Sequence, residues 1–560
     1  MPNVQKKEAK RLAVPGNTAL RRAGVAFGLM TSAAMVLGGP AHAQAQEQQD
    51  DRRGVNVQPY IEASQVLSAQ ISPGDDVVTF TQIAAGVDVN AQGRSSGGSA
   101  SLRYERNINY GDNRIDSDRL TGLARGYIAL DRSVQFDAGA LASTTRLDGG
   151  GGFSANPLVN DEDASSQVYS VFAGPSLNRR VGVVDVSGAT RVGYSRFESN
   201  QAVFDANGDP IDVFGDSTTI NSQLSASTRP GQFLPVGVGV TVGAFQEDIS
   251  NLDQRVRDVY ARANVTVPLT PTFAITGGIG YEDVEVSSRD ALRDANDLPI
   301  LDGSGRFVTD ENSPRVIAFD VDGLLWDVGV LWRPTARTSL AASVGQRYDS
   351  TTYYGNFTYS PNARSSLGVS VYDGVSGFGG GLNSGLANLS NDFSAIRNPV
   401  TGNFGGLVTG AGGPGNVGSL GSIRSAAFRG RGVNVSYQRQ IGRWNAGLAV
   451  GYDNREFIGA PGTVLESLDG VTDESYYALA SLNRQLGDSG RLTANTYYNR
   501  FESGTNSGDV NAAGASVGYT RFITSKLSAR GAVALDYVDS EFATDELIVG
   551  SALVGLRYDF

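Results

Sequence analysis

Charged side chains of both signs recur on the polar face of strand-like segments along this 560-residue chain. Because alternate residues of a strand share one face, carboxylates and guanidinium groups placed in this way line one surface together. They can select ions or sugars along a water-filled path, or pair as a structural network across a closed lumen, and both interpretations stay open. The candidate lumen-lining residues are Asp88, Arg103, Glu105, Arg125, Asp137, Asp185, Arg191, Arg262, Glu282, Asp327, Arg347, Asp453, Arg530 and Asp536.

Residues for covalent or metal chemistry are scarce. Cys is absent, and the single His (His42) and all three Met lie before residue 44. If the first 43 residues are removed, no thiol nucleophile and no histidine acid or base remains. Segment 205–216 faintly resembles a calcium loop, but Asp216 stands where that motif has Glu, which favours a solvated acidic loop. We therefore expect no enzyme activity, no catalytic residue, no metal site and no cofactor.

The first 43 residues have the three parts of a secretory signal peptide. A basic stretch precedes an apolar run over residues 24–37, and Ala41-His42-Ala43 offers small residues for cleavage. Arg21-Arg22 leaves a twin-arginine signal as the alternative. We expect residues 1–43 to be the signal peptide and residues 44–53 to be a short periplasmic N-terminal segment.

The formal net charge is −12, and the basic signal region makes the rest of the chain more negative. Nucleic acid is not an expected partner, because binding to phosphates needs positive charge. After residue 43 no apolar run reaches the roughly 18 residues of a membrane-spanning helix. A soluble secreted protein would share that property, so the strand pattern must decide between the two classes.

From residue 54 to residue 560, a unit of alternating residues followed by a turn or loop repeats along the chain. Between residues 236 and 247, for example, Val and Ala occupy one face, and Gly, Thr, Phe and Glu occupy the other. Such alternation predicts strands with one face in lipid and the other in water. We expect a single all-β fold, a transmembrane antiparallel β-barrel of about 22 strands (roughly 20–24), without the plug domain that a TonB-dependent receptor would carry.

Short turns alternate with longer connections along the chain, a regularity that a soluble β-sandwich rarely keeps. We expect long outer loops near residues 147–167, 198–217, 286–322, 374–425 and 457–473. The longest loop is rich in Gly, yet it carries large apolar residues at helical spacing, namely Leu382, Leu386, Leu389, Phe393 and Ile396. We expect this stripe to form a short helix that folds over or into the barrel mouth as a lid. Packing against neighbouring loops and a surface for an outside partner are the alternatives.

The last segment of the chain places Tyr558 and Phe560 on one face of a strand. This ending resembles the terminal strand that the barrel-assembly machinery recognises in outer-membrane proteins. We therefore expect Tyr558 and Phe560 to be the assembly signal and that machinery to be a partner during biogenesis. The expected location is the cell outer membrane, with its lipid as the permanent partner.

Two turns read alike, Pro-Thr-Ala-Arg-Thr-Ser-Leu at 334–340 and Pro-Asn-Ala-Arg-Ser-Ser-Leu at 361–367. With the strands over about 324–373 and the Phe560 terminus, they resemble the outer-membrane β-barrel family associated with PEP-CTERM and exopolysaccharide systems, and more loosely porin-like β-barrels. The resemblance implies a link to envelope polysaccharide and supplies no catalytic residues. Similar chains are sometimes labelled as the YajC subunit of the preprotein translocase, a small protein with one spanning helix, which no segment after residue 43 could form.

These patterns predict a porin-like passive or gated channel for small polar solutes or saccharide, working by the shape and charge of its lumen. The alternative is a non-conducting structural or surface-interaction barrel linked to envelope polysaccharide. The two differ in whether the charged interior is open to solutes or closed by pairing among its own side chains.

Overall fold

The computed structural model describes residues 54–560, except 75, 111–116, 148–152, 155–164, 200–201, 205–207, 209, 411–414, 417–420, 506–507 and 542–544. The predicted signal peptide (1–43) and N-terminal segment (44–53) lie outside these described residues. Part of the acidic segment 205–216 does so as well.

Twenty-two long strands form one sheet, which a two-residue strand, β6 (Phe153–Ser154), joins only through β5. The long strands are β1 (Gly54–Ser72), β2 (Val77–Gln92), β3 (Ser96–Asn109), β4 (Ser117–Ala129), β5 (Val134–Leu147), β7 (Ser165–Val181), β8 (Val184–Glu198), β11 (Asp216–Thr228), β12 (Gly237–Ile249), β13 (Gln254–Thr270), β14 (Phe273–Ser288), β15 (Val316–Thr335), β16 (Thr338–Arg347), β17 (Ser350–Asn362), β18 (Ser365–Ser376), β22 (Phe428–Ile441), β23 (Trp444–Phe457), β24 (Thr472–Leu486), β25 (Gly490–Glu502), β26 (Val510–Phe522), β27 (Leu527–Ser540) and β28 (Leu547–Asp559). The connections hold β9 (Val203–Phe204), β10 (Pro210–Ile211), η2 (Asn251–Asp253), α2 (Phe378–Ala387), β19 (Phe393–Arg397), β20 (Phe404–Gly410), β21 (Gly415–Asn416) and η3 (Glu466–Leu468).

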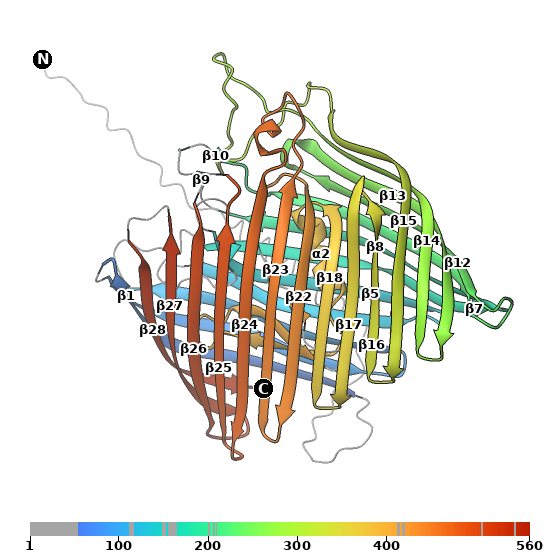
Figure 1. Cartoon of the computed structure of the whole chain (residues 1–560). Coiled ribbons are helices and arrows are strands. Elements are labelled where there is room, and N and C mark those ends of the chain that lie inside the picture. The colour runs from blue at the N-terminus through green and yellow to red at the C-terminus, as the bar shows by residue number, and fades with distance from the viewer. Residues whose placement is uncertain are drawn as a thin grey trace, which may run out of the picture. The chain divides into compact units, whose positions relative to one another are not determined.

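The sheet closes on itself, because the first strand pairs with the last (Figure 1). β1 and β28 run antiparallel in a register from Tyr60 opposite Asp559 to Ser72 opposite Ile548. Closure gives each of the 22 long strands two neighbours, so the backbone amides and carbonyls in the described part of the wall pair with one another. The predicted all-β barrel and its strand number are thereby confirmed.

One end of the ring carries short turns, and we name it the short-turn end; the opposite, long-loop end carries all five predicted long connections. They join β5 to β7, β8 to β11, β14 to β15, β18 to β22 and β23 to β24. The expectation of a strict short–long alternation is wrong at three places on the long-loop end, and the first is the four-residue connection 73–76 between β1 and β2. Ser250 and η2 alone separate β12 from β13. Tyr348 and Asp349 alone separate β16 from β17, and both residues have positive φ angles. A two-residue turn of this kind suits the twist of two paired strands.

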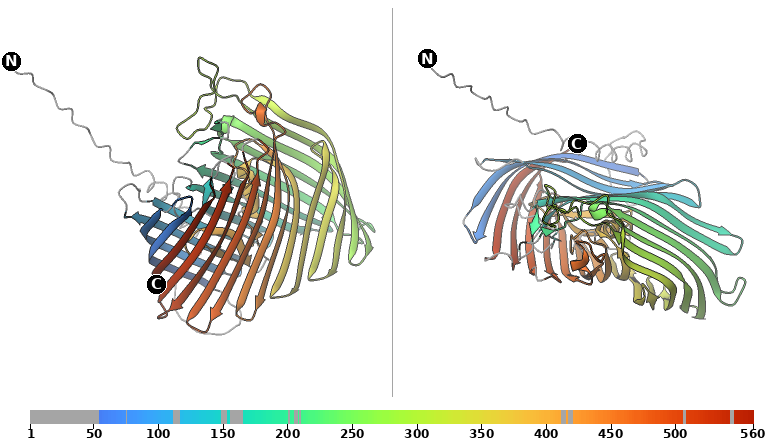
Figure 2. Two further views of the ribbon diagram at one scale, coloured as in Figure 1. Left: turned by 60° about the vertical axis from the view of Figure 1, so that its left-hand side comes forward. Right: turned by 90° about the horizontal axis from the view of Figure 1, so that it is seen from above.

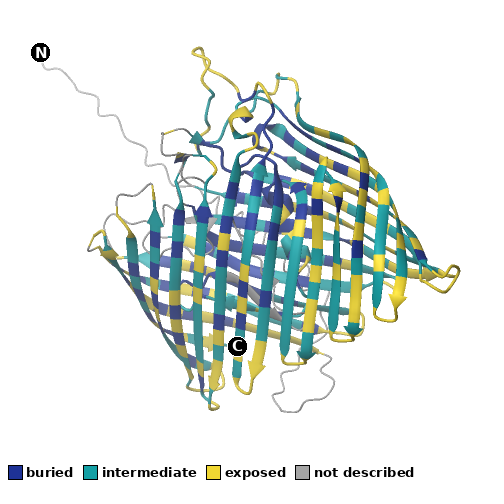
Figure 3. Cartoon of the chain, in the orientation of Figure 1, coloured by how far each residue is buried: buried dark blue, intermediate teal, exposed yellow. Residues whose placement is uncertain are grey.

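Large apolar side chains cover the outer face of the ring. Along the strands, more exposed and less exposed residues alternate, as the colours of Figure 3 show. On β15 the outward residues Trp326 and Trp332 stand six positions apart, with Val328 between them and 51% exposed. Other outward aromatic residues lie near both strand ends, at Tyr104, Tyr194, Tyr281, Tyr353, Tyr476 and Tyr498 toward the long loops, and at Phe136, Tyr359, Tyr519 and Tyr558 toward the short turns. Two aromatic girdles that flank an apolar band mark the part of a barrel that lies in lipid. None of the helices in the described part of the chain is long and apolar enough to span a bilayer.

We expect Val328→Arg to lower the free energy of unfolding in lipid vesicles by roughly 2–4 kcal/mol, because it places a charge in the apolar band between the girdles. Asn356→Arg is the matched control, since Asn356 is exposed on the inner face of β17 and faces polar surroundings. Denaturant unfolding followed by tryptophan fluorescence measures both. Equal losses for the two variants would contradict the inside–outside assignment.

Candidate functional site

We name the connection between β18 and β22, residues 377–427, the inserted loop, and its first described segments turn back into the ring. Its helix α2 contacts strands β5, β7, β8, β11, β12 and β18. Figure 1 and the view from above in Figure 2 show this helix within the ring of strands. The stripe predicted as a lid therefore begins inside the lumen.

The carboxylate of Glu247 on β12 holds the first turn of α2. It accepts hydrogen bonds from the backbone N–H groups of Gly377 and Gly380, at 2.7 and 2.8 Å, and from the Ser217 hydroxyl at 2.9 Å. Helix N-termini leave such N–H groups without helical partners and favour negative charge nearby. Glu247 is fully buried, and a Cβ at Gly380 would collide with its carboxylate. The glycines that begin the helix therefore permit the close approach on which this contact depends.

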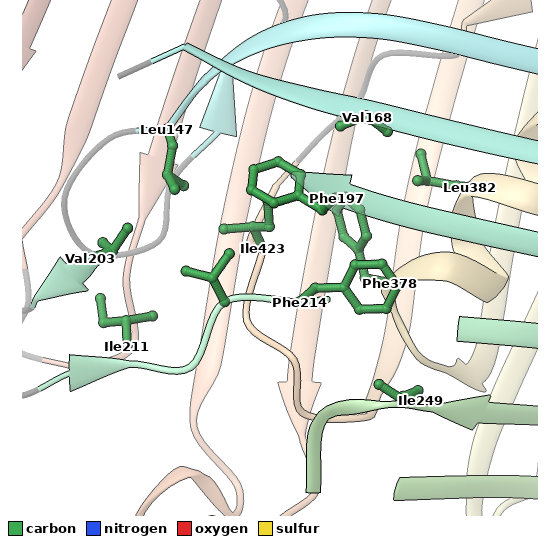
Figure 4. Close-up of a cluster of buried hydrophobic side chains, with 11 residues drawn as sticks. Leu147, Val168, Phe197, Val203, Ile211, Phe214, Ile249, Phe378, Leu382 and Ile423 are labelled. Atoms are coloured by element: carbon green, nitrogen blue, oxygen red, sulfur yellow. The ribbon is translucent and has the colours of Figure 1, made fainter. Parts of the chain in front are cut away.

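The apolar face of α2 packs on the inner wall. Phe378 and Leu382 join Phe197 and Phe214 in one buried cluster, with the Phe214 and Phe378 ring centroids 5.0 Å apart (Figure 4). Leu386, which has no exposed surface, joins a second cluster with wall residues Leu123, Leu141 and Phe172. Burying these side chains keeps large apolar surface out of the wet lumen.

The predicted stripe does not continue as a helix to its end. Leu382 and Leu386 lie in α2, but Leu389 follows it, and Phe393 and Ile396 belong to strand β19. Ser-Asn-Asp at 390–392 intervenes, and such residues compete for backbone hydrogen bonds and end helices. Leu389 and Phe393 still pack in the Leu386 cluster, together with Phe404 of the paired strand β20. Apolar spacing placed these side chains in one core, while polar residues divided the segment into a helix and a hairpin.

The tip of the β19–β20 hairpin, residues 398–403, lies against the wall where the barrel closes, and Val400 packs there with Val66 of β1 and Leu553 of β28. Strands on both sides of this seam hold it. On one side, Arg397 donates to Thr121 of β4 at 2.8 Å, and Asn403 donates to the carbonyl of Thr144 on β5 at 2.6 Å. On the other side, Asn495 of β25 donates to the Arg397 carbonyl at 3.0 Å, and Arg530 of β27 donates to the Pro399 carbonyl at 2.7 Å. The inserted loop thus links these two groups of strands along the inner face of the seam.

A group of charges lies beside this tip at the seam where the barrel closes. Glu62 on β1 pairs with Arg103 of β3, with Arg530 at 2.6 Å and with Arg557 of β28 at 3.5 Å. Glu105 pairs with Arg103 at 3.0 Å. We name Glu62, Arg103, Glu105, Arg530 and Arg557 the seam cluster. Arg103, Glu105 and Arg530 are among the predicted lumen-lining residues. Glu62 and Arg557 are not, although both occupy inward positions on strands whose alternation is visible in the sequence.

A second cluster centres on Arg347 at the end of β16. Its guanidinium pairs with Asp258 at 2.6 Å and with Glu282 at 2.7 Å, and it lies 4.7 Å from the ring centroid of Tyr260. Asp258 is a buried carboxylate that the sequence analysis did not select. It precedes Tyr260 and Arg262 by two and four residues, so strand alternation alone places it on the same inward face.

The remaining predicted residues also have partners on the inner wall. Arg262 pairs with Asp327 at 2.7 Å, Arg125 with Asp137 at 3.7 Å, Asp453 with Arg455 at 2.6 Å, and Asp185 with Arg229 at 2.6 Å; Asp88 accepts from Ser101, Asp536 accepts from Tyr497, and the Arg191 guanidinium lies 5.9 Å from the Phe172 ring centroid. Asp185 lies apart from the others, at the short-turn end. The structure therefore distributes the fourteen predicted residues among separate pairs and clusters and does not gather them into one constriction.

Inward tyrosines form a different kind of surface. Tyr260, Tyr372, Tyr477 and Tyr497 each stand directly opposite a glycine on the neighbouring strand, respectively Gly243, Gly432, Gly451 and Gly514. A Cβ at any of these glycines would collide with the tyrosine side chain, so each ring lies over its glycine. Tyr372 stays 37% exposed and donates to Asp453 at 2.6 Å, while Tyr354 on β17 is 38% exposed. Aromatic rings and polar groups thus face the lumen from β17 and β18.

Four connections meet at Asp212 on the long-loop end. Its carboxylate accepts from Asn251 at 3.0 Å, from the Phe307 backbone N–H at 3.1 Å and from the Ser425 hydroxyl at the exit of the inserted loop. Arg306 donates to the carbonyl of Val213 at 3.0 Å beside it. Burial raises the pKa of the Asp212 carboxyl to about 6, although the hydrogen bonds it accepts and the nearby Arg306 charge act in the opposite direction.

No family model and no curated protein sequence matches this chain. Among solved structures, it is similar to the FrpB iron transporter of Neisseria meningitidis (11% identity, TM-score 0.43, covering 90% of this chain and 81% of that one). It is also similar to the siderophore receptor PiuA of Acinetobacter baumannii (10% identity, TM-score 0.42, covering 90% of this chain and 82% of that one). A third similar structure is the copper transporter OprC (12% identity, TM-score 0.39, covering 92% of this chain and 84% of that one).

The closed ring itself identifies the environment of the protein. Its 22 long strands, apolar outer band and two aromatic girdles are the architecture of a barrel of the bacterial outer membrane. The protein is located in that membrane.

We expect Glu247→Ala to release α2 from the wall. A cysteine introduced at Ser195, which is buried beneath α2, reports the release by its rate of reaction with a maleimide. The rate should rise roughly ten- to a hundredfold, because hydrogen bonds to a charged acceptor contribute about 1.5–3 kcal/mol each. Glu247→Gln should have a smaller effect, since it keeps an acceptor of the same shape. Gln246→Ala is the control, and an equal rate in it and in Glu247→Ala would contradict the anchoring role.

We expect the loop junction at Asp212 to weaken as the pH rises. A carboxyl whose folded pKa exceeds its unfolded value contributes stability that is complete below about pH 4 and is lost as the pH passes about 6, a change of up to about 3 kcal/mol. Hydrogen exchange of the Phe307 and Ser425 amides, corrected for intrinsic rates, should show more opening at pH 7 than at pH 4.5. Asp212→Asn should remove this difference. Opening that is greater at the lower pH would contradict the assigned direction.

Proposed function

We propose that the protein is an outer-membrane channel for small polar solutes, saccharides in particular, and that the inserted loop governs how far its lumen is open. The observation that supports this proposal is the path of the loop. The described part of the inserted loop from α2 to β20 enters the lumen and is held there by separate side-chain contacts, while the wall of β17 and β18 keeps Tyr354, Asn356 and Tyr372 exposed. A loop bound by such contacts can leave the wall without unfolding the strands.

The exposed inner wall has the chemistry that a saccharide requires. A sugar ring has apolar C–H faces and a rim of hydroxyl groups, so it fits aromatic side chains accompanied by hydrogen-bonding partners. Tyr354 and Tyr372 supply the rings, and Tyr372 is joined to the Asp453–Arg455 pair. Arg455 in turn donates to the Ser422 carbonyl at 2.6 Å, which connects this wall to the inserted loop. The function proposed is transport without covalent chemistry.

We further propose that the inserted loop, rather than a separate plug domain, fills the interior. The resemblance to barrels of exopolysaccharide systems supports an envelope polysaccharide as the origin of the solute. The alternative function, a non-conducting structural barrel, is favoured by one observation: most charges of the inner wall already pair with one another. Conductance distinguishes the two functions.

We expect a disulfide between Gly421→Cys and Ser475→Cys to suppress channel opening. A Cβ at Gly421 would stand 3.5 Å from that of Ser475 on β24, within the range of a disulfide, and the chain has no other cysteine. In planar bilayers the oxidised variant should open less often than the wild type, and reduction should restore opening. Deletion of residues 380–398 should give larger or steadier currents.

Each single-cysteine variant is a control for the tether, and a heat-dependent shift on gels confirms that every variant has folded. A neutral oligosaccharide added to the bath should interrupt the current of the wild type by occupying the lumen. Equal currents in the oxidised, reduced and deleted forms would contradict gating by the inserted loop. Silence of all forms would contradict the channel and favour the structural barrel.

A further inference from the structure

Basic residues are distributed around the short-turn end of the ring. Ten connections lie at this end, and seven of them contain an exposed Arg or Lys within the turn. We name these seven residues the basic collar: Arg94, Arg132, Arg229, Arg337, Arg364, Arg443 and Lys526. Arg179 and Arg180, Arg333, and Arg484 and Arg491 flank or face the remaining three turns and are also exposed. Positive charge therefore surrounds the whole rim and is not confined to one side.

Few carboxylates at this end neutralise the basic collar. Asp131 accepts the Ser133 and Val134 backbone N–H groups of its own turn, and Asp559 pairs with Arg557. Among the residues that the structure describes, only Arg229 of the basic collar forms an ion pair, with Asp185. Arg337 donates to the Pro361 carbonyl at 2.6 Å, and the basic side chains of the other five turns are available to an external anion.

The opposite end has the reverse charge. The connection from residue 289 to 315 alone carries six carboxylates, Asp290, Asp294, Asp297, Asp302, Asp310 and Glu311, against four arginines. These four arginines donate to groups of their own or neighbouring loops; Arg289, for instance, pairs with Asp253 at 2.8 Å. The charge asymmetry therefore lies along the barrel axis, between the two membrane surfaces.

The basic collar stands at the height of lipid headgroups. Trp332 and Tyr359 belong to the aromatic girdle near the short turns. Each precedes the arginine of the adjacent turn, Arg337 or Arg364, by five residues. Trp444 directly follows Arg443, and the guanidinium of Arg484 lies 4.4 Å from the Trp444 ring centroid. Girdle aromatics mark the membrane–water interface, and the long stems of Arg and Lys let their charged ends reach the headgroup layer.

We propose that the basic collar binds the headgroups of anionic phospholipids in the leaflet at the short-turn end. Lipids surround a barrel on every side, and so does the basic collar, whereas a protein partner would meet a patch on one side. Anionic headgroups attract basic residues at a membrane surface, and a ring of separate positive charges fits a shell of individual lipids. This interaction is independent of conduction, so it stands whether or not the lumen opens.

The three native tryptophans provide a direct test, because Trp332 and Trp444 lie beside the basic collar while Trp326 lies in the other girdle. The full-length protein is folded into vesicles of phosphatidylcholine with a minor fraction of brominated phosphatidylglycerol. In a Trp326→Phe background, quenching should show phosphatidylglycerol enriched about threefold or more over its share of the bilayer. The enrichment should disappear at high salt, which screens charge.

The collar variant changes Arg94, Arg132, Arg364, Arg443 and Lys526 to Gln and should lower the enrichment to the bulk value. Its matched control also introduces five Gln residues, but at arginines near the long-loop end, namely Arg106, Arg196, Arg255, Arg257 and Arg500. This control should keep the enrichment. A wild type without enrichment at low salt would overturn the proposal, and so would enrichment that both variants retain. The Trp332→Phe/Trp444→Phe variant leaves Trp326 as the reporter in the other girdle. Phosphatidylglycerol enrichment that quenches Trp326 but not Trp332 and Trp444 would also overturn the proposal. If the wild type instead binds isolated peptidoglycan in a salt-sensitive way and shows no lipid preference, the partner is an acidic cell-wall polymer and the proposal is wrong.

Discussion

Pairing of the backbone within lipid is the constraint on which the rest of this structure depends. A strand in the hydrocarbon layer cannot leave its amides and carbonyls to water, so a sheet that spans the membrane must close into a ring. Here closure requires the first strand to find the last across nearly the whole chain. The β1–β28 register meets that requirement, and the seam cluster places Glu62 of β1 among arginines from β3, β27 and β28. Charge pairing on the inside thus accompanies the backbone pairing that closes the wall.

A ring of this size creates an interior that its own wall cannot fill. The protein fills part of it with a piece of its longest connection, which α2 attaches to one region of the wall and the β19–β20 hairpin extends toward another. The contacts are mixed in kind: an apolar face at Leu386, a carboxylate at Glu247 and hydrogen bonds at the hairpin tip. Elsewhere, tyrosines lie over glycines of the next strand and cover the inner wall without projecting far into the lumen. An interior built in this way is occupied on one side and lined by exposed aromatic and polar groups on the other.

The two ends of the barrel meet different surroundings, and their compositions differ accordingly. The long connections are tied to one another through buried polar contacts such as those of Asp212 and Arg306, and their acidic side chains face the water above the membrane. The short turns are too brief to form such contacts with one another. Their arginines remain exposed and lie next to an aromatic girdle. The same short–long division that organises the topology therefore also separates the charges.

The sequence by itself determined the class of fold, the number of strands and the position of every long loop. Alternation with a period of two is a local property of a strand in contact with lipid and water, so Val328 and Asn356 report their faces without reference to distant residues. The same rule placed Arg347 and Glu282 on the inner face. Apolar spacing also identified Leu386 and Phe393 as residues that must be buried, although it extended the helix too far, because the spacing of side chains does not record where Ser, Asn and Asp interrupt the backbone.

Only the tertiary structure decided which inner residues meet. Glu62 and Arg557 lie at opposite ends of the chain, and nothing local to either one shows that closure brings them together. Asp258 is a partner of Arg347 because the register of the two strands between them places both residues at the same level along the barrel axis. Glu247 is an anchor because a distant glycine-rich segment contacts its carboxylate. Strand alternation fixes the face of a residue, whereas ring register and loop path fix its neighbours. Those depend on the closure of the whole barrel, which is a property of all its strands together.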